Sequence, residues 1–238
     1  MKKVVFNYLI FVTFAALAVF SSCNKENDNK TDVYVAGIGI NEQGIAVAKL
    51  WKNEVVLNLS NIGSGANSVY VSGRDVYIVG YEESKATLWK NGVAQYLNDG
   101  TRNASANSVY VSGSDVYVAG NPNIAYTSAI LWKNGISQYL VKNDNTVHAR
   151  ANSVYVSGVN VYAAGNQIVY ISAALWRNGI AQNLNDGTSW TEALSVYVLS
   201  DGITYVAGYG VNAQNLFAAK LWKNGVSLSH QRNFLFMC

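Results

Sequence analysis

Cysteine, proline and histidine are scarce in this chain, and the shortages exclude several classes of protein. The 238 residues include two cysteines, one proline and two histidines. Cys23 and Cys238 alone cannot form a disulfide framework, so stability must come from an apolar core, which a chain of this length with 50% apolar residues can supply. His148 and His230 are too few and too far apart in the sequence to indicate a metal site or a catalytic triad. We expect no metal and no cofactor.

Charged residues are also few, at 13% of the chain, and they do not gather in patches. Lys and Arg mostly stand singly in predicted turns, so we expect no binding of nucleic acid. Asp75, Asp115 and Asp201 occupy equivalent tight turns, where bonding to the backbone accounts for them. No pair of acids at strand positions suits glycoside hydrolysis, and no glycine-rich phosphate loop precedes a helix. We therefore expect a protein that is not an enzyme, with glycoside chemistry as the least favoured alternative.

A block with the sequence Leu-Trp-Lys-Asn, or Leu-Trp-Arg-Asn in the fourth copy, occurs five times along the chain. A period near 40 residues that contains four short apolar runs is typical of propeller blades. The sequence therefore predicts an all-β propeller of about five four-stranded blades. A fragment of a larger propeller and an open array of blades are the alternatives. The repeated tryptophans, at spacings of 38, 43, 44 and 46 residues, are Trp51, Trp89, Trp132, Trp176 and Trp222.

The third repeat shows the four runs most clearly, because turn residues separate them. Val and Tyr, which favour strands, dominate the first two runs. The third run ends in Trp132, and the Asn134-Gly135 pair that follows it suits a type I′ hairpin turn. We expect the tryptophan to fill the space between blades, and each run to be covered on both faces. The four runs are 108–112, 115–119, 129–132 and 136–140.

Both ends of the repeat array are irregular. The first repeat enters at Asp32 with a segment that matches a second run, so the first blade lacks its first strand. The tail 230–238 does not resemble the repeat. Phe234 to Met237 is a candidate for the strand that closes the ring, and a divergent end that leaves the array open is the other interpretation. The predicted repeats are 32–65, 66–105, 106–150, 151–192 and 193–238.

The N-terminus has the order of a secretory signal. Two lysines precede the apolar stretch 4–20, which small residues follow. A stretch of 17 residues is at the short limit for a transmembrane anchor, which is the structural alternative. The segment Phe20-Ser21-Ser22-Cys23 resembles the lipobox of bacterial lipoproteins.

That resemblance implies cleavage before Cys23 and a lipid on its sulfur. Residues 1–22 are then a signal peptide, and 23–31 are a polar tether. The acylated chain would be held on a membrane of the cell envelope. Because Asn24 rather than Asp follows the cysteine, we expect the outer membrane, on either its periplasmic or its exposed side.

Sequence diversity is confined to one of the two faces that turns and loops make on an up-and-down blade. The turns after the first and third runs are short and uniform, whereas the loops after the second and fourth runs differ in every repeat. Loops on a rigid scaffold commonly carry function, so this variable loop face is the expected binding site. Its candidate ligand-binding residues are Trp190, Tyr81, Tyr126, Tyr170, Tyr209, Asp99 and Asp186.

Two kinds of partner suit such a face. The first is a protein partner, held by an envelope-anchored scaffold. The alternative is a glycan, because aromatic rings stack on the C–H surfaces of sugars while amides and carboxylates bind the hydroxyls. The architecture is similar to that of the five-bladed lectins of the tachylectin family, although their ligand residues find no counterparts here. Asn185-Asp186-Gly187 resembles the aspartate box of sialidase propellers, but its spacing and its place in the repeat differ.

Overall fold

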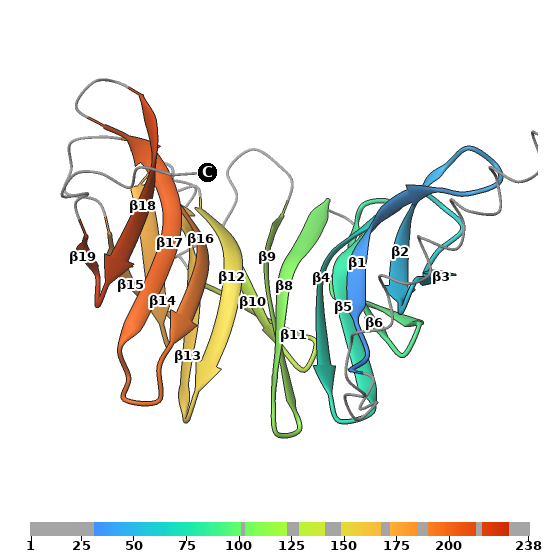
Figure 1. The fold of residues 1–238 in the computed structure, drawn as a ribbon, viewed down its shortest axis with the longest axis horizontal. Coiled ribbons are helices and arrows are strands. Elements are labelled where there is room, and N and C mark those ends of the chain that lie inside the picture. The colour runs from blue at the N-terminus through green and yellow to red at the C-terminus, as the bar shows by residue number, and fades with distance from the viewer. Residues whose placement is uncertain are drawn as a thin grey trace, which may run out of the picture. The chain divides into compact units, whose positions relative to one another are not determined.

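Nineteen β-strands make up the regular structure of the described residues (Figure 1). The computed structural model describes residues 31–100, 103–122, 129–140, 149–167, 172–184, 190–212 and 216–228, and these ranges contain no helix. Every strand belongs to the second of the chain's two units, Val33–Cys238. The predicted all-β class is confirmed for this part of the chain.

The strands form five antiparallel sheets in sequence order, which we call blades 1 to 5. Blade 1 has three strands, and each of the others has four, as expected from the absence of a first run in the first repeat. Blades 1 and 2 comprise β1 (Tyr34–Ile40), β2 (Ala46–Lys52) and β3 (Val55–Asn58), then β4 (Ser64–Ser72), β5 (Asp75–Glu82), β6 (Lys85–Lys90) and β7 (Val93–Tyr96). Blade 3 comprises β8 (Ala104–Ser112), β9 (Asp115–Pro122), β10 (Ile130–Lys133) and β11 (Ile136–Tyr139). Blades 4 and 5 comprise β12 (Ala149–Ser157), β13 (Asn160–Gln167), β14 (Ser172–Arg177) and β15 (Ile180–Asn183), then β16 (Thr191–Val198), β17 (Thr204–Val211), β18 (Phe217–Lys223) and β19 (Val226–Ser227).

A β-bulge interrupts the pairing of the first two strands in blades 2 to 5. In blade 3 the register shifts between Ala106 and Ser108, opposite Gly120. A Cβ atom on Gly120 would lie 2.1 Å from the carbonyl oxygen of Ser105, so no larger residue fits without displacing the backbone. The equivalent glycines of the other three bulged blades are crowded by backbone in the same way.

Each blade has two different faces, because adjacent residues of a strand point to opposite sides of the sheet. The Trp face carries the tryptophan of the repeat. The Leu face carries the leucine before that tryptophan, together with an alanine two residues farther back, a tyrosine of the second strand and the leucine that follows the fourth strand. The buried core consists of four clusters, each of which joins the Leu face of one blade to the Trp face of the next.

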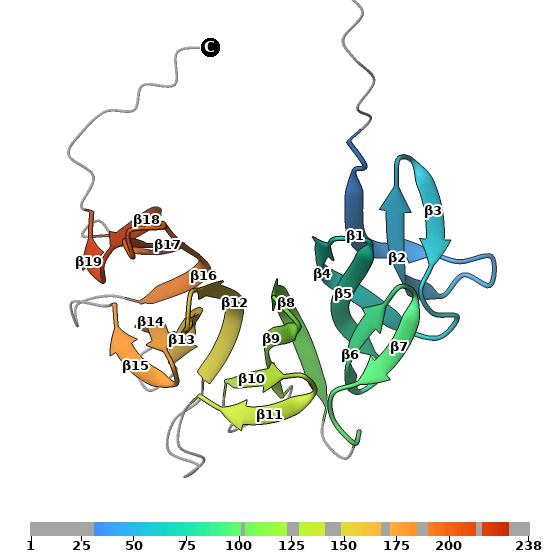
Figure 2. The ribbon, with the colours of Figure 1, turned by 90° about the horizontal axis from the view of Figure 1, so that it is seen from below.

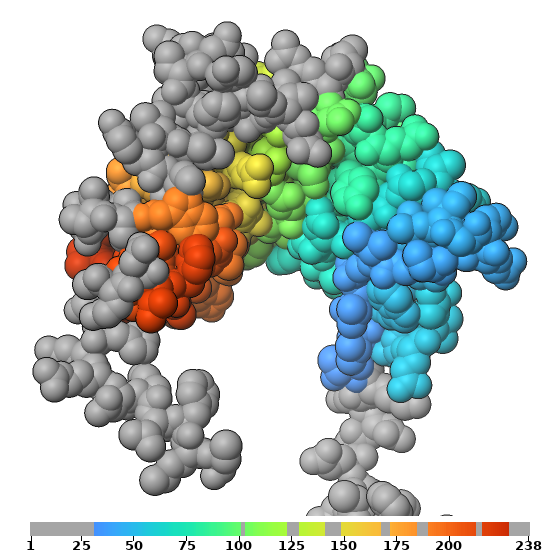
Figure 3. Space-filling model, turned by 90° about the horizontal axis from the view of Figure 1, so that it is seen from above, coloured from blue at the N-terminus to red at the C-terminus, as the bar shows by residue number. Residues whose placement is uncertain are grey.

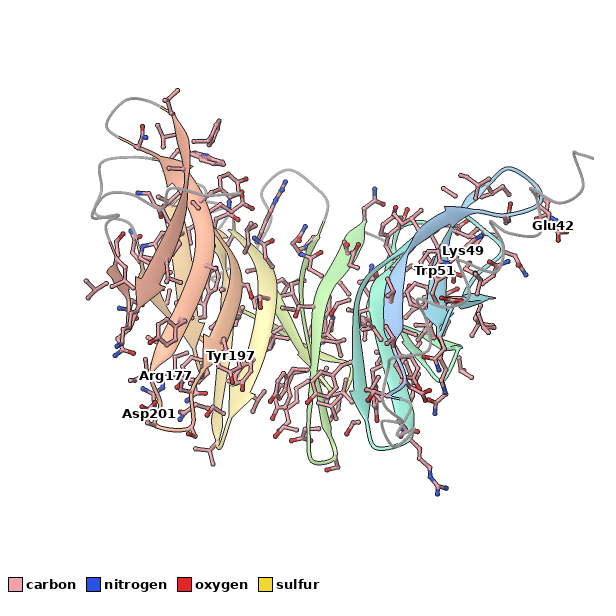
Figure 4. The ribbon with its side chains drawn as sticks, viewed as in Figure 1. Glu42, Lys49, Trp51, Arg177, Tyr197 and Asp201 are labelled. Carbon is pink, nitrogen blue, oxygen red and sulfur yellow. The ribbon has the colours of Figure 1, made fainter. Side chains whose placement is uncertain are left out.

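The tryptophans confirm this packing at four of five blades. Trp89, Trp132, Trp176 and Trp222 are at most 1% exposed, as expected for side chains that fill the space between blades. Trp51 differs, because it is only partly buried. No preceding blade covers the Trp face of blade 1 in the described structure, so the sequence-based expectation is wrong for this residue (Figure 4).

The expectation that every run is covered on both faces is also wrong for the fourth strands. The second strands β5, β9 and β13 are largely buried, as expected. All positions of β3, β7, β11 and β15 are exposed. Figure 2 shows these outer strands at the rim of the second unit, where neighbouring blades diverge and no longer cover them.

The first strands lie side by side on the inner side of the array. β4 contacts β8, β8 contacts β12, and β12 contacts β16. Tyrosine rings of these strands form a ladder, with centroids 5.0 Å apart for Tyr70 and Tyr110, 4.8 Å for Tyr110 and Tyr155, and 5.1 Å for Tyr155 and Tyr197. Burial raises the pKa of Tyr110 in the middle of this ladder.

The described residues of the second unit form a propeller-like arc of five blades that does not close on itself. β1 packs on β4 of the next blade but has no comparable contact with β16 to β19 (Figures 2 and 3). The segment 234–237, named above as a candidate closing strand, lies outside the described residues.

Candidate binding face

The uniform turns of the repeat are built around one asparagine. Asn91, Asn134, Asn178 and Asn224 have φ between 50° and 52°, and the glycine after each has φ between 80° and 83°. Positive φ at both central residues is the mark of the predicted type I′ turn. The side-chain oxygen of each asparagine accepts a backbone N–H from the neighbouring turn, at 2.8 to 2.9 Å, and the donors are Val76, Val116, Val161 and Thr204.

Two aspartates complete these turns. The amide of Asn91 donates to Asp75 at 2.8 Å, and that of Asn134 donates to Asp115 at 2.8 Å. Lys90 and Lys133 pair with the same carboxylates, at 3.0 and 2.7 Å. The hydrogen bond from Asn91 holds the pKa of Asp75 below its ordinary value, and the hydrogen bond from Lys133 does the same for Asp115. Both carboxylates therefore serve as parts of turns.

The strand ends that lead into the variable loops lie on the opposite side of the blades, at the top of Figure 1. Of the candidate ligand-binding residues, Tyr81, Asp99, Trp190 and Tyr209 are described, whereas Tyr126, Tyr170 and Asp186 lie outside the described residues. Asp99 is exposed, and the other three are partly buried. Trp190 and Tyr209 lie together on blade 5, and Tyr81 lies on blade 2.

An aromatic cluster on blade 5 brings two of these candidates together. The ring of Trp190 lies 5.2 Å from Tyr209 and 5.4 Å from Phe217, between centroids, and Tyr209 lies 6.0 Å from Phe217. Phe217 is 72% exposed, and the adjacent Leu216 is 63% exposed. We call Trp190, Tyr209, Leu216 and Phe217 the aromatic cluster. Rings that pack on one another and still face solvent can bury further apolar surface against a partner.

A glutamate anchors the cluster to the neighbouring blade. The hydroxyl of Tyr209 donates to Glu192 at 2.8 Å, which raises the pKa of Tyr209. The amide of Asn152 on blade 4 donates to the other oxygen of Glu192 at 3.3 Å. These contacts connect the aromatic ring to two blades, so the cluster is held by the scaffold rather than by its loop alone.

Sequence analysis missed Phe217 and Leu216 as site residues. It named neither residue among the candidates for the variable loop face. A signal was nevertheless present, because two large apolar residues stand together after the polar stretch 212–215. The exposure of Phe217 follows from its position on the Leu face of β18, which no further blade covers in the described structure.

A polar hollow of about 570 Å³ opens on the same face beside blades 2, 3 and 4. Asparagines at its floor fasten the blades together. Asn107 donates to the carbonyl of Ala151 at 2.9 Å and to Asn121 at 2.8 Å. The hollow therefore rests on rigid inner strands and has a lining rich in amides. Its lining includes Tyr81, Glu83, Asn103, Asn121, Arg150 and Asn152.

Glu82 is the one buried carboxylate of the described residues, and its partners account for it. It accepts hydrogen bonds from the hydroxyls of Ser60 and of Tyr96, the latter at 2.6 Å. The bond to Glu82 raises the pKa of Tyr96. The ammonium group of Lys85 lies 4.2 Å from the centre of the Tyr96 ring. Glu82 thus links blades 1 and 2 instead of facing a cavity.

Within the described ranges, no three His, Cys, Asp or Glu side chains lie close enough to hold a metal ion. Nor do those ranges contain a helix long and apolar enough to cross a membrane. A scan against protein-family models gives no match, and a search of curated protein sequences gives none either.

Proposed function

We propose that this protein is a binding scaffold whose variable loop face holds a protein partner through the aromatic cluster. The observation that carries the proposal is the exposure of Phe217 (72%) and Leu216 (63%) beside the partly buried rings of Trp190 and Tyr209. Aromatic anchors dominate binding energy at protein interfaces, and this cluster is already ordered by its ring contacts. A preorganised anchor loses little freedom when it binds.

The test is site-specific photocrosslinking in the cells that make the protein. A photoreactive phenylalanine analogue at position 217 should form a covalent adduct with a different protein, which mass spectrometry distinguishes from an adduct between two copies of this chain. The same analogue at Val159, 93% exposed on the uniform turn face, is the matched control and should form none. Unlabelled protein should compete for the adduct, and the Leu216→Ser/Phe217→Ser double variant should not. Equal adducts at 159 and 217, or none at 217, would contradict the proposal.

The scaffold is proposed to sit on the cell envelope, anchored by lipid on Cys23. Support comes from the order of the first 23 residues, which lie outside the described part of the chain. Acyl chains of this kind hold a protein on a membrane without a spanning helix. Metabolic labelling with palmitate should mark the wild-type chain and leave the Cys23→Ala variant unlabelled. Equal labelling of both chains would contradict lipid attachment at this residue.

For the array itself, we favour the open arrangement over closure by the tail. The support is the absence of packing between β1 and the strands of blade 5 in the described structure.

A glycan is the second candidate ligand, and the polar hollow favours it. Amides, Arg150 and the ring of Tyr81 line a volume of about 570 Å³, which suits a ligand with many hydroxyls. A glycan array probed with the wild-type protein and with the Tyr81→Ala and Arg150→Gln variants separates the two candidates. Glycan binding that both variants lose would favour the hollow, whereas Phe217→Ser should leave it unchanged. Absence of wild-type binding would remove this candidate.

A further inference from the structure

The Leu face of blade 5 repeats a pattern that is buried in blades 2 to 4 and buried or partly buried in blade 1. Blades 1 to 4 each present five side chains of this pattern to the next blade. They are a tyrosine, two leucines and two small residues, which are alanines except for Val79 in blade 2. Blade 5 has the same residue types at the equivalent positions, although no following blade covers them in the described structure. These positions are Tyr205, Ala207, Ala219, Leu221 and Leu228.

The leucines on the Leu face are much more exposed in blade 5 than in the other blades. The leucine before the tryptophan is 7% exposed in blade 1 and 3% exposed in blade 4, but Leu221 is 39% exposed. The leucine after the fourth strand is 5% exposed at Leu184, whereas Leu228 is 45% exposed. These positions of blade 5 lie on β17, on β18 and directly after β19, and exposed apolar surface of this kind is typical of interaction sites.

The complementary surface stands at the other end of the array. The Trp face of blade 1 is the one Trp face of the described structure that no Leu face covers. Val35 is 52% exposed there, and Trp51 is partly exposed. In blades 2 to 5, by contrast, the Trp face packs against the Leu face of the preceding blade. The two uncovered surfaces are therefore the two halves of an interface that occurs four times inside the chain.

Leu194 indicates that the Leu face of blade 5 is suited to contact a blade that, like blade 1, lacks a first strand. At three interfaces an asparagine of the bulge donates to a carbonyl on the first strand of the next blade, as Asn152 does to Ala193 at 2.9 Å. Blade 5 has Leu194 at this position, and it is 47% exposed. Among the described residues blade 1 has no first strand, so it offers no such carbonyl, and an asparagine facing it would lack its acceptor.

We propose that the Leu face of blade 5 binds the Trp face of blade 1 from a second copy of this chain. Among the described residues of one chain these surfaces are separate, because β1 makes no packing contact with β16 to β19 comparable to its contact with β4, and the arc of described strands is open between them (Figures 2 and 3). The contact is head to tail, so it joins different patches on the two copies and can extend to further copies.

The test uses two variants of the full chain, each of which disables one half of the contact. Leu221→Asp/Leu228→Asp alters blade 5, and Val35→Asp alters blade 1. All three residues are already exposed, so both variants should fold, which circular dichroism checks. Wild-type protein should self-associate in sedimentation experiments. The dissociation constant for self-association of each variant alone should be at least about tenfold higher than that of the wild type, because a charge replaces an apolar contact.

Mixing the two variants is the decisive step. The blade 1 surface of the first variant and the blade 5 surface of the second remain intact, so an equimolar mixture should form a 1:1 dimer that cannot extend. Val159→Asp, a change on the uniform turn face, should leave wild-type association unchanged. A mixture that remains monomeric, or a wild-type chain that is monomeric at all concentrations, would overturn the proposal. If the wild-type chain is monomeric and its Trp51 is also shielded from solvent, the two ends of the array close on each other within one chain.

Discussion

At the scale of single residues, asparagine and glycine determine how strands meet in this chain. The asparagine after each repeat tryptophan binds the neighbouring turn, and the asparagine of the bulge binds the next blade. A glycine opposite each bulge leaves room for a backbone carbonyl. These residues recur because the same turn and the same bulge recur in successive blades.

Replacing Asn91 by glycine should raise the pKa of Asp75 toward its ordinary value of 3.8. Glycine keeps the positive φ of the turn and removes the hydrogen bond that lowers this pKa most. Titration of the Asp75 carboxyl by NMR measures the shift. The equivalent Asp115 keeps its own asparagine and serves as the internal control, so a parallel change at both carboxyls would contradict the assignment.

The sign of the pH effect follows from the lowered pKa of Asp75. Because the folded value lies below the unfolded one, the stabilisation is present above the unfolded pKa and disappears as the pH falls through the folded pKa. Wild type and Asn91→Gly should therefore differ in stability near neutral pH and converge in acid, after allowance for the change in the turn itself. Urea unfolding at several pH values checks this.

Gly120 should not tolerate alanine. The added Cβ would overlap the carbonyl oxygen of Ser105, so the change should cost about 3 kcal/mol in unfolding free energy. Gly37 occupies the equivalent position in blade 1, where a Cβ meets only the ring of Trp51, at 3.2 Å. Gly37→Ala is thus the matched control and should cost much less. Similar losses in both variants, measured by denaturant unfolding, would show that the bulge is not the cause.

At the scale of elements, the blade is the unit that could be predicted from sequence. Strand-sized runs, Asn-Gly turns and the missing first strand of blade 1 all followed from local pattern, because turn chemistry and β propensity act over a few residues. The exposure of the fourth strands did not follow, since it depends on how neighbouring blades diverge at the rim. Phe217 was missed for a related reason, because its exposure depends on the lack of a covering blade beside blade 5 in the described structure.

A pair of leucines tests blade packing directly. Leu131 is 6% exposed between blades 3 and 4, whereas Leu221 occupies the same repeat position in blade 5 and is 39% exposed. Leu131→Ala should cost about 3 kcal/mol through lost burial and a cavity. Leu221→Ala should cost about 1 kcal/mol or less in dilute solution. Equal losses in unfolding experiments would mean that the two faces are equally covered.

At the scale of the whole molecule, we assign function to the surfaces that take no part in blade packing or in the uniform turns. The repeat accounts for the core and for the uniform turns, and what remains is the variable loop face and the two uncovered ends. The sequence predicted which side of the blades would vary, but not the polar hollow, because its lining comes from three blades. Whether a ligand binds there depends on contacts that no single repeat contains.

The central claim is that each tryptophan of blades 2 to 5 is sealed against the preceding blade, while Trp51 and Trp190 remain accessible. Fluorine NMR of the 5-fluorotryptophan-labelled chain with a soluble nitroxide tests it most directly, at a concentration that keeps the chain monomeric. Signals are assigned by single Trp→Phe variants. The account predicts broadening of Trp51 and Trp190 and sharp signals from the other four tryptophans. Uniform broadening of all six, or protection of Trp51 in the monomer, would contradict it.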